Sequence, residues 1–234
     1  MKRIFLFLLL VLALVLLLES ATALGQSVKQ YGGAGFFRIG YANLHQIGRT
    51  LTQLNPSLPT PSTNDFVYIG GEGYARLDKI ILGAGGYGMA RRSFGSSTYY
   101  AEPFCGGGYL YIGRVVVDTH RFWLYPLAGV GGTVVGMTQS QQQGTSTSES
   151  SAILPNINAQ LGLGADWLMA TFGEDNTYGG VLLGLRAGYQ MSPYSTGWKT
   201  TGDLLGTDRP RYATNGFFVT LTVGVGAFRR TPNP

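Results

Sequence analysis

The chain has 234 residues, of which 12% are charged and 44% are hydrophobic, and its formal net charge is +5. Charged residues make up roughly a quarter of soluble domains, so this composition has trouble covering a surface that faces water on all sides. The small and dispersed positive charge does not indicate a nucleic-acid partner. The single cysteine, Cys105, excludes an intrachain disulfide framework and is expected to be a small apolar filler in a strand.

The first 23 residues have the layout of a secretory signal peptide. Lys2 and Arg3 precede an unbroken apolar run over 4–18, and an A-x-A cleavage site ends at Ala23. A retained anchor helix is the alternative, but a spanning helix needs roughly 20 apolar residues and this run is shorter. We therefore predict a cleaved signal peptide over 1–23.

The rest of the chain is organised in segments of period-two alternation that are rich in Gly, Val, Leu and aromatic residues. Eight such segments are present, over 31–42, 65–77, 79–90, 104–117, 121–136, 153–169, 178–190 and 214–228. Most are longer than a typical strand of a globular sheet and suit the roughly 9–11 residues with which a tilted strand crosses a bilayer. The sequence predicts an all-β fold, with 24–234 forming one closed antiparallel up-and-down β-barrel of about eight strands.

The connections between these segments alternate in length along the chain. The short or moderate ones fall at 78, 118–120 and 170–177, and the long ones are the predicted loops 43–64, 91–103, 137–152 and 191–213. Alternate connections of an up-and-down barrel lie at opposite ends, and outer-membrane barrels have short periplasmic turns and long outer loops. We therefore expect all four loops outside the cell. The Gln-, Ser- and Thr-rich loop 137–152 is expected to be mobile.

The segments have an apolar and a polar face. In 214–228, for example, Leu221 and Val223 alternate with Thr220 and Thr222, so lipid would contact the first pair and the lumen the second. Eight strands leave an interior just wide enough for side chains, so we expect a closed lumen. Six charged residues fall on candidate inward faces and are predicted to form an ionic network: Arg38, Glu72, Arg76, Arg114, Asp166 and Arg186. A proton or ion path is the functional alternative.

One residue conflicts with this pattern. Pro126 lies inside the segment 121–136, where it cannot donate a hydrogen bond to a neighbouring strand, so a bulge or break is predicted there.

The signal peptide, the eight alternating segments, the loop lengths and the last strand, Phe217–Phe228, resemble the small outer-membrane β-barrel proteins of Gram-negative bacteria. The resemblance covers nearly the whole mature chain, but no motif indicates a particular branch. It implies a location in the outer membrane, with the lipid bilayer as partner. Proteins of this class include structural proteins, adhesins, lipid-modifying enzymes and narrow channels, and the fold does not choose among them.

Signals of catalysis are weak. The G-x-G-x-x-G spacing at 83–88 lacks the following helix that a dinucleotide site needs. His45, His120 and Cys105 have no metal-ligand spacing, so no cofactor or metal is predicted. Among the histidines only His45 is placed for a rim-active lipid hydrolase with a Ser–His pair, and no serine can be assigned to it. We therefore do not expect an enzyme.

The long loops are the expected functional surface, because loops on a rigid scaffold usually carry binding. Candidate contacts are concentrated in the last loop: Tyr194, Trp198, Arg209, Arg211 and Tyr212. Tyr and Trp also mark membrane interfaces, which is the alternative interpretation. The sequence favours a structural or surface-interaction role, with unidentified extracellular or periplasmic protein partners. The alternatives are a soluble, secreted lipocalin-like barrel that binds a small apolar ligand and the rim-active hydrolase.

Overall fold

A computed structural model of the chain describes residues 29–44, 65–89, 94–96, 99–143, 146–174, 177–201 and 211–231. The regular structure in these ranges consists of β-strands. Within the same ranges, no helix is long and apolar enough to cross a membrane. The predicted signal peptide over 1–23 lies outside the described residues.

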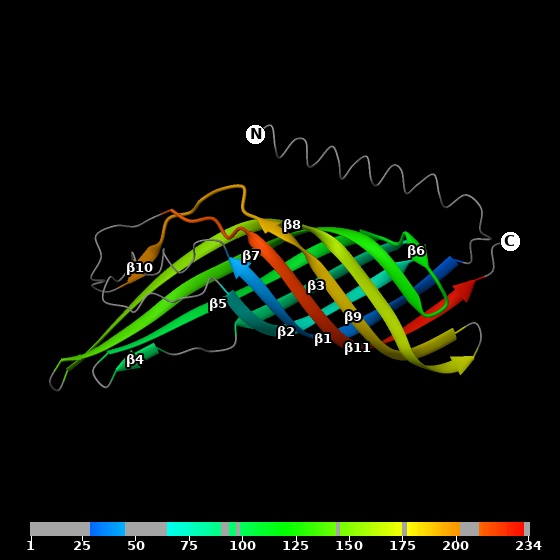
Figure 1. Cartoon of the computed structure of the whole chain (residues 1–234), viewed down its shortest axis with the longest axis horizontal. Helices are drawn as coiled ribbons and strands as arrows, with labels where there is room; N and C mark the ends of the chain where they lie inside the picture. The colour runs from blue at the N-terminus through cyan, green and yellow to red at the C-terminus, as the bar shows by residue number, and fades with distance from the viewer. Residues whose placement is uncertain are drawn as a thin grey trace.

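Eight long antiparallel strands form a closed ring (Figure 1). They are β1 (Lys29–Leu44), β2 (Asp65–Leu77), β3 (Ile80–Met89), β5 (Tyr99–Arg114), β7 (Phe122–Gln143), β8 (Ser146–Glu174), β9 (Thr177–Met191) and β11 (Gly216–Thr231). Each of these strands pairs with the next in the series, and β11 also pairs with β1, which closes the ring. The predicted closed up-and-down barrel of about eight strands is confirmed.

The two ends of the barrel differ in their connections. At one end, here called the short-turn end, β2 and β3 are joined only by Asp78 and Lys79. Asp78 has a positive φ of 59°, a left-handed conformation that Asp tolerates better than most residues. Lys29 at the start of β1 pairs with Thr231 at the end of β11, so the barrel begins and ends at this end. The opposite end is the loop end.

The predicted loop 137–152 is wrong, because most of it is strand. β7 continues to Gln143, β8 begins at Ser146, and the two remain paired in register to their tips. This hairpin runs out past the other barrel strands (Figure 1). The low-complexity composition indicated a mobile loop, but the two sides of this segment extend a β7–β8 ladder that is already formed.

Short strands flank this hairpin at the loop end. β4 (Phe94–Ser96) pairs with the first residues of β5, and β10 (Lys199–Thr201) pairs with β8. The remaining short strand, β6 (Val117–Asp118), lies at the short-turn end beside β7. The predicted loops 91–103 and 191–213 therefore contain strand structure as well.

The predicted break at Pro126 is also wrong. β7 is paired with β8 without a shift at this point, with Pro126 opposite Leu163. On its other side, the ladder with β5 ends at Leu127 and the ladder with β6 begins at Leu124. Pro126 thus lies between two ladders, where the missing N–H removes no strand pairing. The one register shift described between barrel strands is in β8, between Leu168 and Ala170.

Candidate functional site

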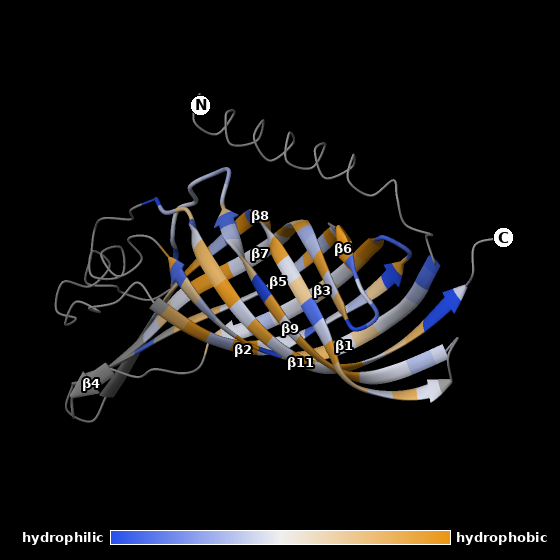
Figure 2. Ribbon diagram, turned by 45° about the vertical axis from the view of Figure 1, so that its right-hand side comes forward, coloured by the Kyte–Doolittle hydropathy of each residue, from blue (hydrophilic) through white to orange (hydrophobic). Residues whose placement is uncertain are grey.

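The outer face of the barrel is apolar. Residues predicted to face lipid are exposed, including Leu221 and Leu185, and Ile157 has 72% of its surface exposed. Apolar residues recur along the strands, whereas hydrophilic residues gather at several strand ends (Figure 2). An apolar exterior around a closed antiparallel ring is the lipid-facing surface of a transmembrane barrel.

Aromatic residues mark both edges of this surface. Tyr31, Trp167 and Phe172 are exposed toward the short-turn end, and Tyr41, Tyr189 and Phe217 toward the loop end. The rings of Tyr41 and Phe217 lie 5.9 Å apart on neighbouring strands. Tyr31 and Tyr41 are ten residues apart on β1, which at about 3.3 Å per residue and a tilt of about 40° gives roughly 25 Å, the usual height of the apolar band.

Arg114 does not lie in the lumen, contrary to the prediction. It is exposed on the same outward face as Leu110 and Ile112, in accordance with the two-residue period of β5. The charge is tolerated there because Arg114 ends the strand at the short-turn rim, opposite Ile80, where a long basic side chain can reach lipid head groups and water. Its charge had suggested an inward position.

Four of the predicted lumen residues form one ionic network inside the barrel: Arg38, Glu72, Asp166 and Arg186. Arg186 lies between the two acids, with Nη2 3.1 Å from Glu72 Oε1 and Nη1 2.7 Å from Asp166 Oδ1. Arg38 Nη1 lies 3.6 Å from Glu72 Oε2. The network joins β1 and β2 to β8 and β9 across the lumen, with two positive and two negative charges.

Aromatic donors complete this network on the side of Asp166. Its Oδ2 accepts hydrogen bonds from the hydroxyls of Tyr74 and Tyr125 at 3.1 and 3.0 Å, and from Trp123 Nε1 at 3.0 Å. Asp166 is fully buried. A buried carboxylate is stable only when it is paired and hydrogen bonded, and here both oxygens have partners.

Arg38 is enclosed by tyrosines on the other side of the network. It donates hydrogen bonds to the hydroxyls of Tyr109 and Tyr68 and to Thr220 Oγ1. Its guanidinium also lies 4.8, 5.0 and 5.7 Å from the ring centroids of Tyr109, Tyr68 and Tyr87. Such cation–π contacts stabilise a desolvated arginine.

The last predicted network member, Arg76, belongs to a separate group nearer the short-turn end. Its Nη2 lies 2.5 Å from Asp118 Oδ2, and its guanidinium is 5.3 Å from the Trp123 ring. Trp123 in turn packs edge-on against Phe228 at 5.3 Å. Four fully or nearly fully buried side chains pack together at this end and are here called the closing cluster: Ile81, Trp123, Leu182 and Phe228. The lumen is filled here.

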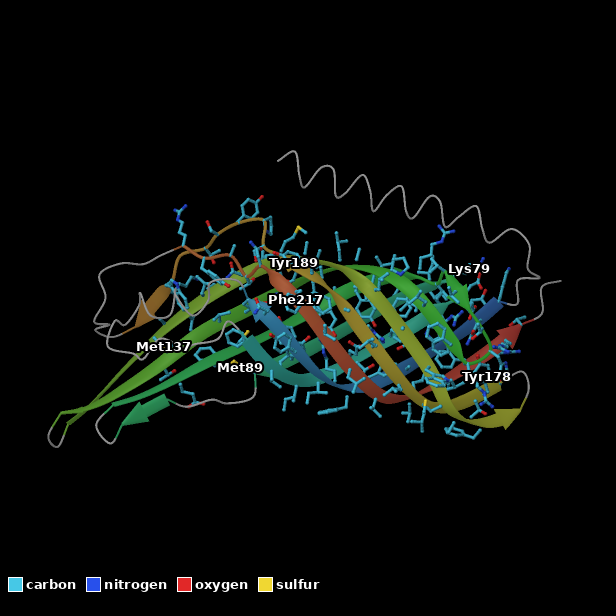
Figure 3. The ribbon with its side chains drawn as sticks, in the orientation of Figure 1. Lys79, Met89, Met137, Tyr178, Tyr189 and Phe217 are labelled. Atoms are coloured by element: carbon cyan, nitrogen blue, oxygen red, sulfur yellow. The ribbon has the colours of Figure 1, made fainter. Side chains whose placement is uncertain are left out.

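The half of the lumen toward the loop end is hollow. A cavity that is partly open to solvent is bounded below by Arg38, Glu72 and Arg186. Its walls include Ala42, Leu44, Phe66, Met89, Cys105 and Phe218. In Figure 3, Met89 and Met137 lie toward this end, and Lys79 and Tyr178 toward the other. Side chains were expected to fill the interior; this half is an exception.

Glycines make room for the network. A Cβ added to Gly184 would lie 2.5 Å from Asp166 Oδ1 and 2.8 Å from Arg186 Nη1. By contrast, a Cβ on Gly35 would meet nothing within 4 Å. Gly184 therefore allows the central ion pair to approach, whereas Gly35 on the outer face has open space around it.

The predicted contacts of the last loop divide into two kinds. Tyr194 and Arg211 are exposed, Arg209 lies outside the described residues, and Trp198 and Tyr212 are buried. Trp198 and Tyr212 pack in one apolar cluster with Leu44, Cys105, Val135, Met137, Ala152 and Leu154. Burial raises the pKa of the Tyr212 phenol. Sequence reasoning placed all five at a binding surface, but these two are anchors of the loop.

Neither histidine forms a catalytic group among the described residues. His45 lies outside them, and His120 lies at the short-turn end, where Arg230 Nη1 is 2.5 Å from its Nδ1. The glycines of 83–88 lie within β3 and not before a helix. In the described part of the chain no group of three or more His, Cys, Asp or Glu could hold a metal ion. Among the described residues, the ionic network and the cavity above it are therefore the candidate functional sites.

No protein-family model matches the sequence, and a search of curated proteins found no match. Solved structures of similar fold include Ail, the attachment invasion locus protein of Yersinia pestis, at 12% identity over 86% of this chain and 98% of that chain, with a TM-score of 0.37. Neisserial surface protein A is 15% identical over 84% of this chain and 95% of that chain, with a TM-score of 0.31. A major outer membrane protein of Thermus thermophilus is 8% identical over 86% of this chain and 99% of that chain, with a TM-score of 0.40.

Proposed function

We propose that this protein is an outer-membrane β-barrel that acts in surface interaction through its loop end, after export and removal of residues 1–23. The apolar outer face with its two aromatic edges supports a barrel embedded in lipid. It disfavours the soluble lipocalin-like barrel, because such a barrel would expose this face to water.

The observation that carries the proposal is the unequal construction of the two ends. At the short-turn end, the closing cluster fills the lumen and the connections are short. At the loop end, β5, β7 and β8 continue as a sheet beyond the ring, with β4 and β10 along its sides. A filled lumen argues against transport, so the function belongs to the structure that extends from the loop end.

The extended sheet is suited to contact with other molecules without uncontrolled self-association. Its flanking strands β4 and β10 have three residues each. Short edge strands limit edge-to-edge pairing between copies. The tract between Gln139 and Ser151 consists of Gln, Ser, Thr and Gly with one Glu, which offers hydrogen-bonding groups and little net charge.

Orientation is tested with single cysteines in a Cys105→Ser background. Ser148→Cys places a thiol in the hairpin, and Thr231→Cys places one at the end of β11. A membrane-impermeant maleimide added to intact cells should label the first and leave the second unlabelled until the cells are permeabilised. Equal labelling of both positions in intact cells would overturn the assignment of the ends.

The role of the hairpin is tested by shortening it. Thr138 and Ser151 pair directly, so replacing 139–150 with Asn-Gly gives a two-residue turn of a type that joins paired strands. The shortened chain should still fold, as shown by faster migration of the unheated protein in gels, but cells that display it should lose the adhesion or autoaggregation conferred by the full chain. If both chains confer the same behaviour, a purely structural role replaces this proposal.

A channel and an enzyme are tested separately. Because the closing cluster fills the lumen, planar-bilayer recordings of the mature chain should show no stable, large conductance. Reproducible large steps would support a channel instead. For the rim-active hydrolase, phospholipid hydrolysis by the purified chain and its loss in His45→Ala would have to be observed.

A further inference from the structure

The loop-end cavity has the composition of a ligand site. Its lining is mostly apolar with a few polar groups, which is the usual composition of small-molecule pockets, where the polar groups fix orientation. Here the wall above the base is mostly apolar, with Leu44, Phe66, Met89 and Phe218, and it also includes Thr133, Gln160 and Gln190. The polar groups with charge, Arg38, Glu72 and Arg186, lie together at its base.

Cationic side chains outnumber anionic ones at the base of the cavity. Two arginines and one carboxylate line it, whereas Asp166 lies beneath and is not part of the lining. The buried acceptor Glu72 Oε1 makes no hydrogen bond, but it is ion-paired with Arg186 Nη2 at 3.1 Å. Nε of Arg38 and Nε of Arg186 are buried and have no hydrogen-bond partner, and the side chain of Arg38 is 6% exposed. Buried N–H groups without an acceptor are costly, so an oxygen-bearing group at this place would be stabilised.

The ring is closed at the base of the cavity, because Arg38, Glu72 and Arg186 all lie within continuous ladders. Nearer the loop end, the ladder of β3 and β5 ends at Gly88 and Gly106, directly before Met89 and Cys105 of the cavity wall. The cavity is therefore enclosed by paired strands at its base and is open toward the loop end.

We infer that the loop-end cavity binds a single-chain amphiphile of the fatty-acid class. The carboxylate lies at the base against Arg38 and Arg186, and the hydrocarbon chain runs along the apolar wall toward the loop end. The carboxylate supplies the acceptors that the two Nε groups lack, and charge-assisted hydrogen bonds of this kind are about twice as strong as neutral ones. This site is independent of the surface role of the hairpin.

The test uses decanoate as the probe and the methionine methyl groups as reporters. Met89 lines the cavity, whereas Met169 is exposed on the outer face. The full mature chain is labelled with ¹³C-methyl methionine, folded in detergent and titrated with decanoate. Saturable movement of the Met89 resonance with Met169 unchanged is the expected result. Movement of both together would mean partition into the micelle only and would overturn the inference, as would the absence of any saturable change.

Two matched tryptophan substitutions separate the cavity from the outer face. Ala42 lines the cavity, and Ala187, opposite Val219 on the outward face, lies at a similar height. Ala42→Trp should weaken decanoate binding at least tenfold, because the indole fills the space, while Ala187→Trp should bind as the original chain does. Both variants keep the ionic network, and the gel-mobility assay confirms folding. Equal binding by the two variants contradicts a site in the cavity.

The head group is tested by changing the probe and not the protein. Methyl decanoate has the same chain but no charge, so it should bind at least tenfold more weakly than decanoate. Decyltrimethylammonium should not produce the Met89 change at all, because the base of the cavity carries two arginines. If the cation binds as well as the carboxylate, the assignment of an anionic head group fails.

Discussion

The two halves of the lumen are built within the same ring of strands and yet are packed in opposite ways. Toward the short-turn end, Trp123, Phe228 and Ile81 are fully or nearly fully buried and pack in one cluster. Toward the loop end, the walls carry Ala42 and Cys105 at inward positions, and space remains between them. The ionic network lies at the boundary between the two halves.

Strand number alone therefore does not decide whether such a barrel is filled. An eight-stranded ring can just be filled by its own side chains, provided that enough of them are large. The short-turn half meets this condition with aromatic rings. The loop-end half does not, because small residues alternate with rings such as Tyr68, which packs against Tyr87 at 5.1 Å.

The largest loss of stability should come from disrupting the ionic network between the two halves. Asp166→Ala removes the partner of Arg186 and the acceptor shared by Tyr74, Trp123 and Tyr125. Loss of one member of a buried ion pair costs about 3–5 kcal/mol, so the free energy of unfolding in urea, measured in lipid vesicles, should fall by that amount. Asp166→Asn keeps acceptor oxygen and should cost less. Equal, small losses in both would show that the network does not stabilise the barrel.

The next effect concerns the outer face, which is common to both halves. Leu221→Arg places a charge near the middle of the apolar band and should cost roughly 2–4 kcal/mol. Leu77→Arg is the control, since Leu77 lies opposite Tyr31 at the short-turn edge, where the same change costs about 0–1 kcal/mol. The two are compared by unfolding in vesicles. If Leu221→Arg is harmless, the outward assignment of this face is wrong.

A smaller effect is expected from a single methyl group at the boundary. Gly184→Ala introduces a Cβ that would lie 2.5 Å from Asp166 Oδ1, and overpacking of this kind costs about 1–3 kcal/mol. Gly35→Ala meets open space and should leave stability within about 0.5 kcal/mol of the original chain. Thermal unfolding of the two variants, measured under the same conditions, compares their stabilities. Indistinguishable variants would mean that the network adjusts without cost.

The smallest loss of stability is expected beside the cavity, and it can be compared with a loss in the closing cluster on the same strand, β3. Met89→Ala trims a side chain that borders the cavity, so it should cost less than about 1 kcal/mol, well below the 2–5 kcal/mol of a packed Met→Ala change. Ile81→Ala, on the same strand but in the closing cluster, should cost about 2–5 kcal/mol. Similar losses at both positions, measured by urea unfolding, would mean that the cavity collapses around Met89.

The strands and their faces could be predicted from the amino-acid sequence, because the two-residue period is a local property of an extended chain. The strand 65–77 was predicted with the bounds that the structure has, and the inward positions of Glu72 and Arg76 follow from alternation alone. The same rule, applied strictly, also places Arg114 outside with Ile112. Its charge misled the prediction because a charged residue at a strand end can face outward at the membrane edge.

Contacts between residues on different strands of the closed ring could not be predicted in the same way. The pairing of Arg186 with both Glu72 and Asp166 joins residues from three strands, and no local pattern specifies which acid a given arginine meets. The burial of Trp198 and Tyr212 depends on a wall contributed by distant strands. Most of 137–152 continues as strand because its two sides extend a ladder that is already formed. The cavity, finally, is lined by residues from several strands, including the small Ala42 and Cys105, and only the closed barrel brings these residues to the same height.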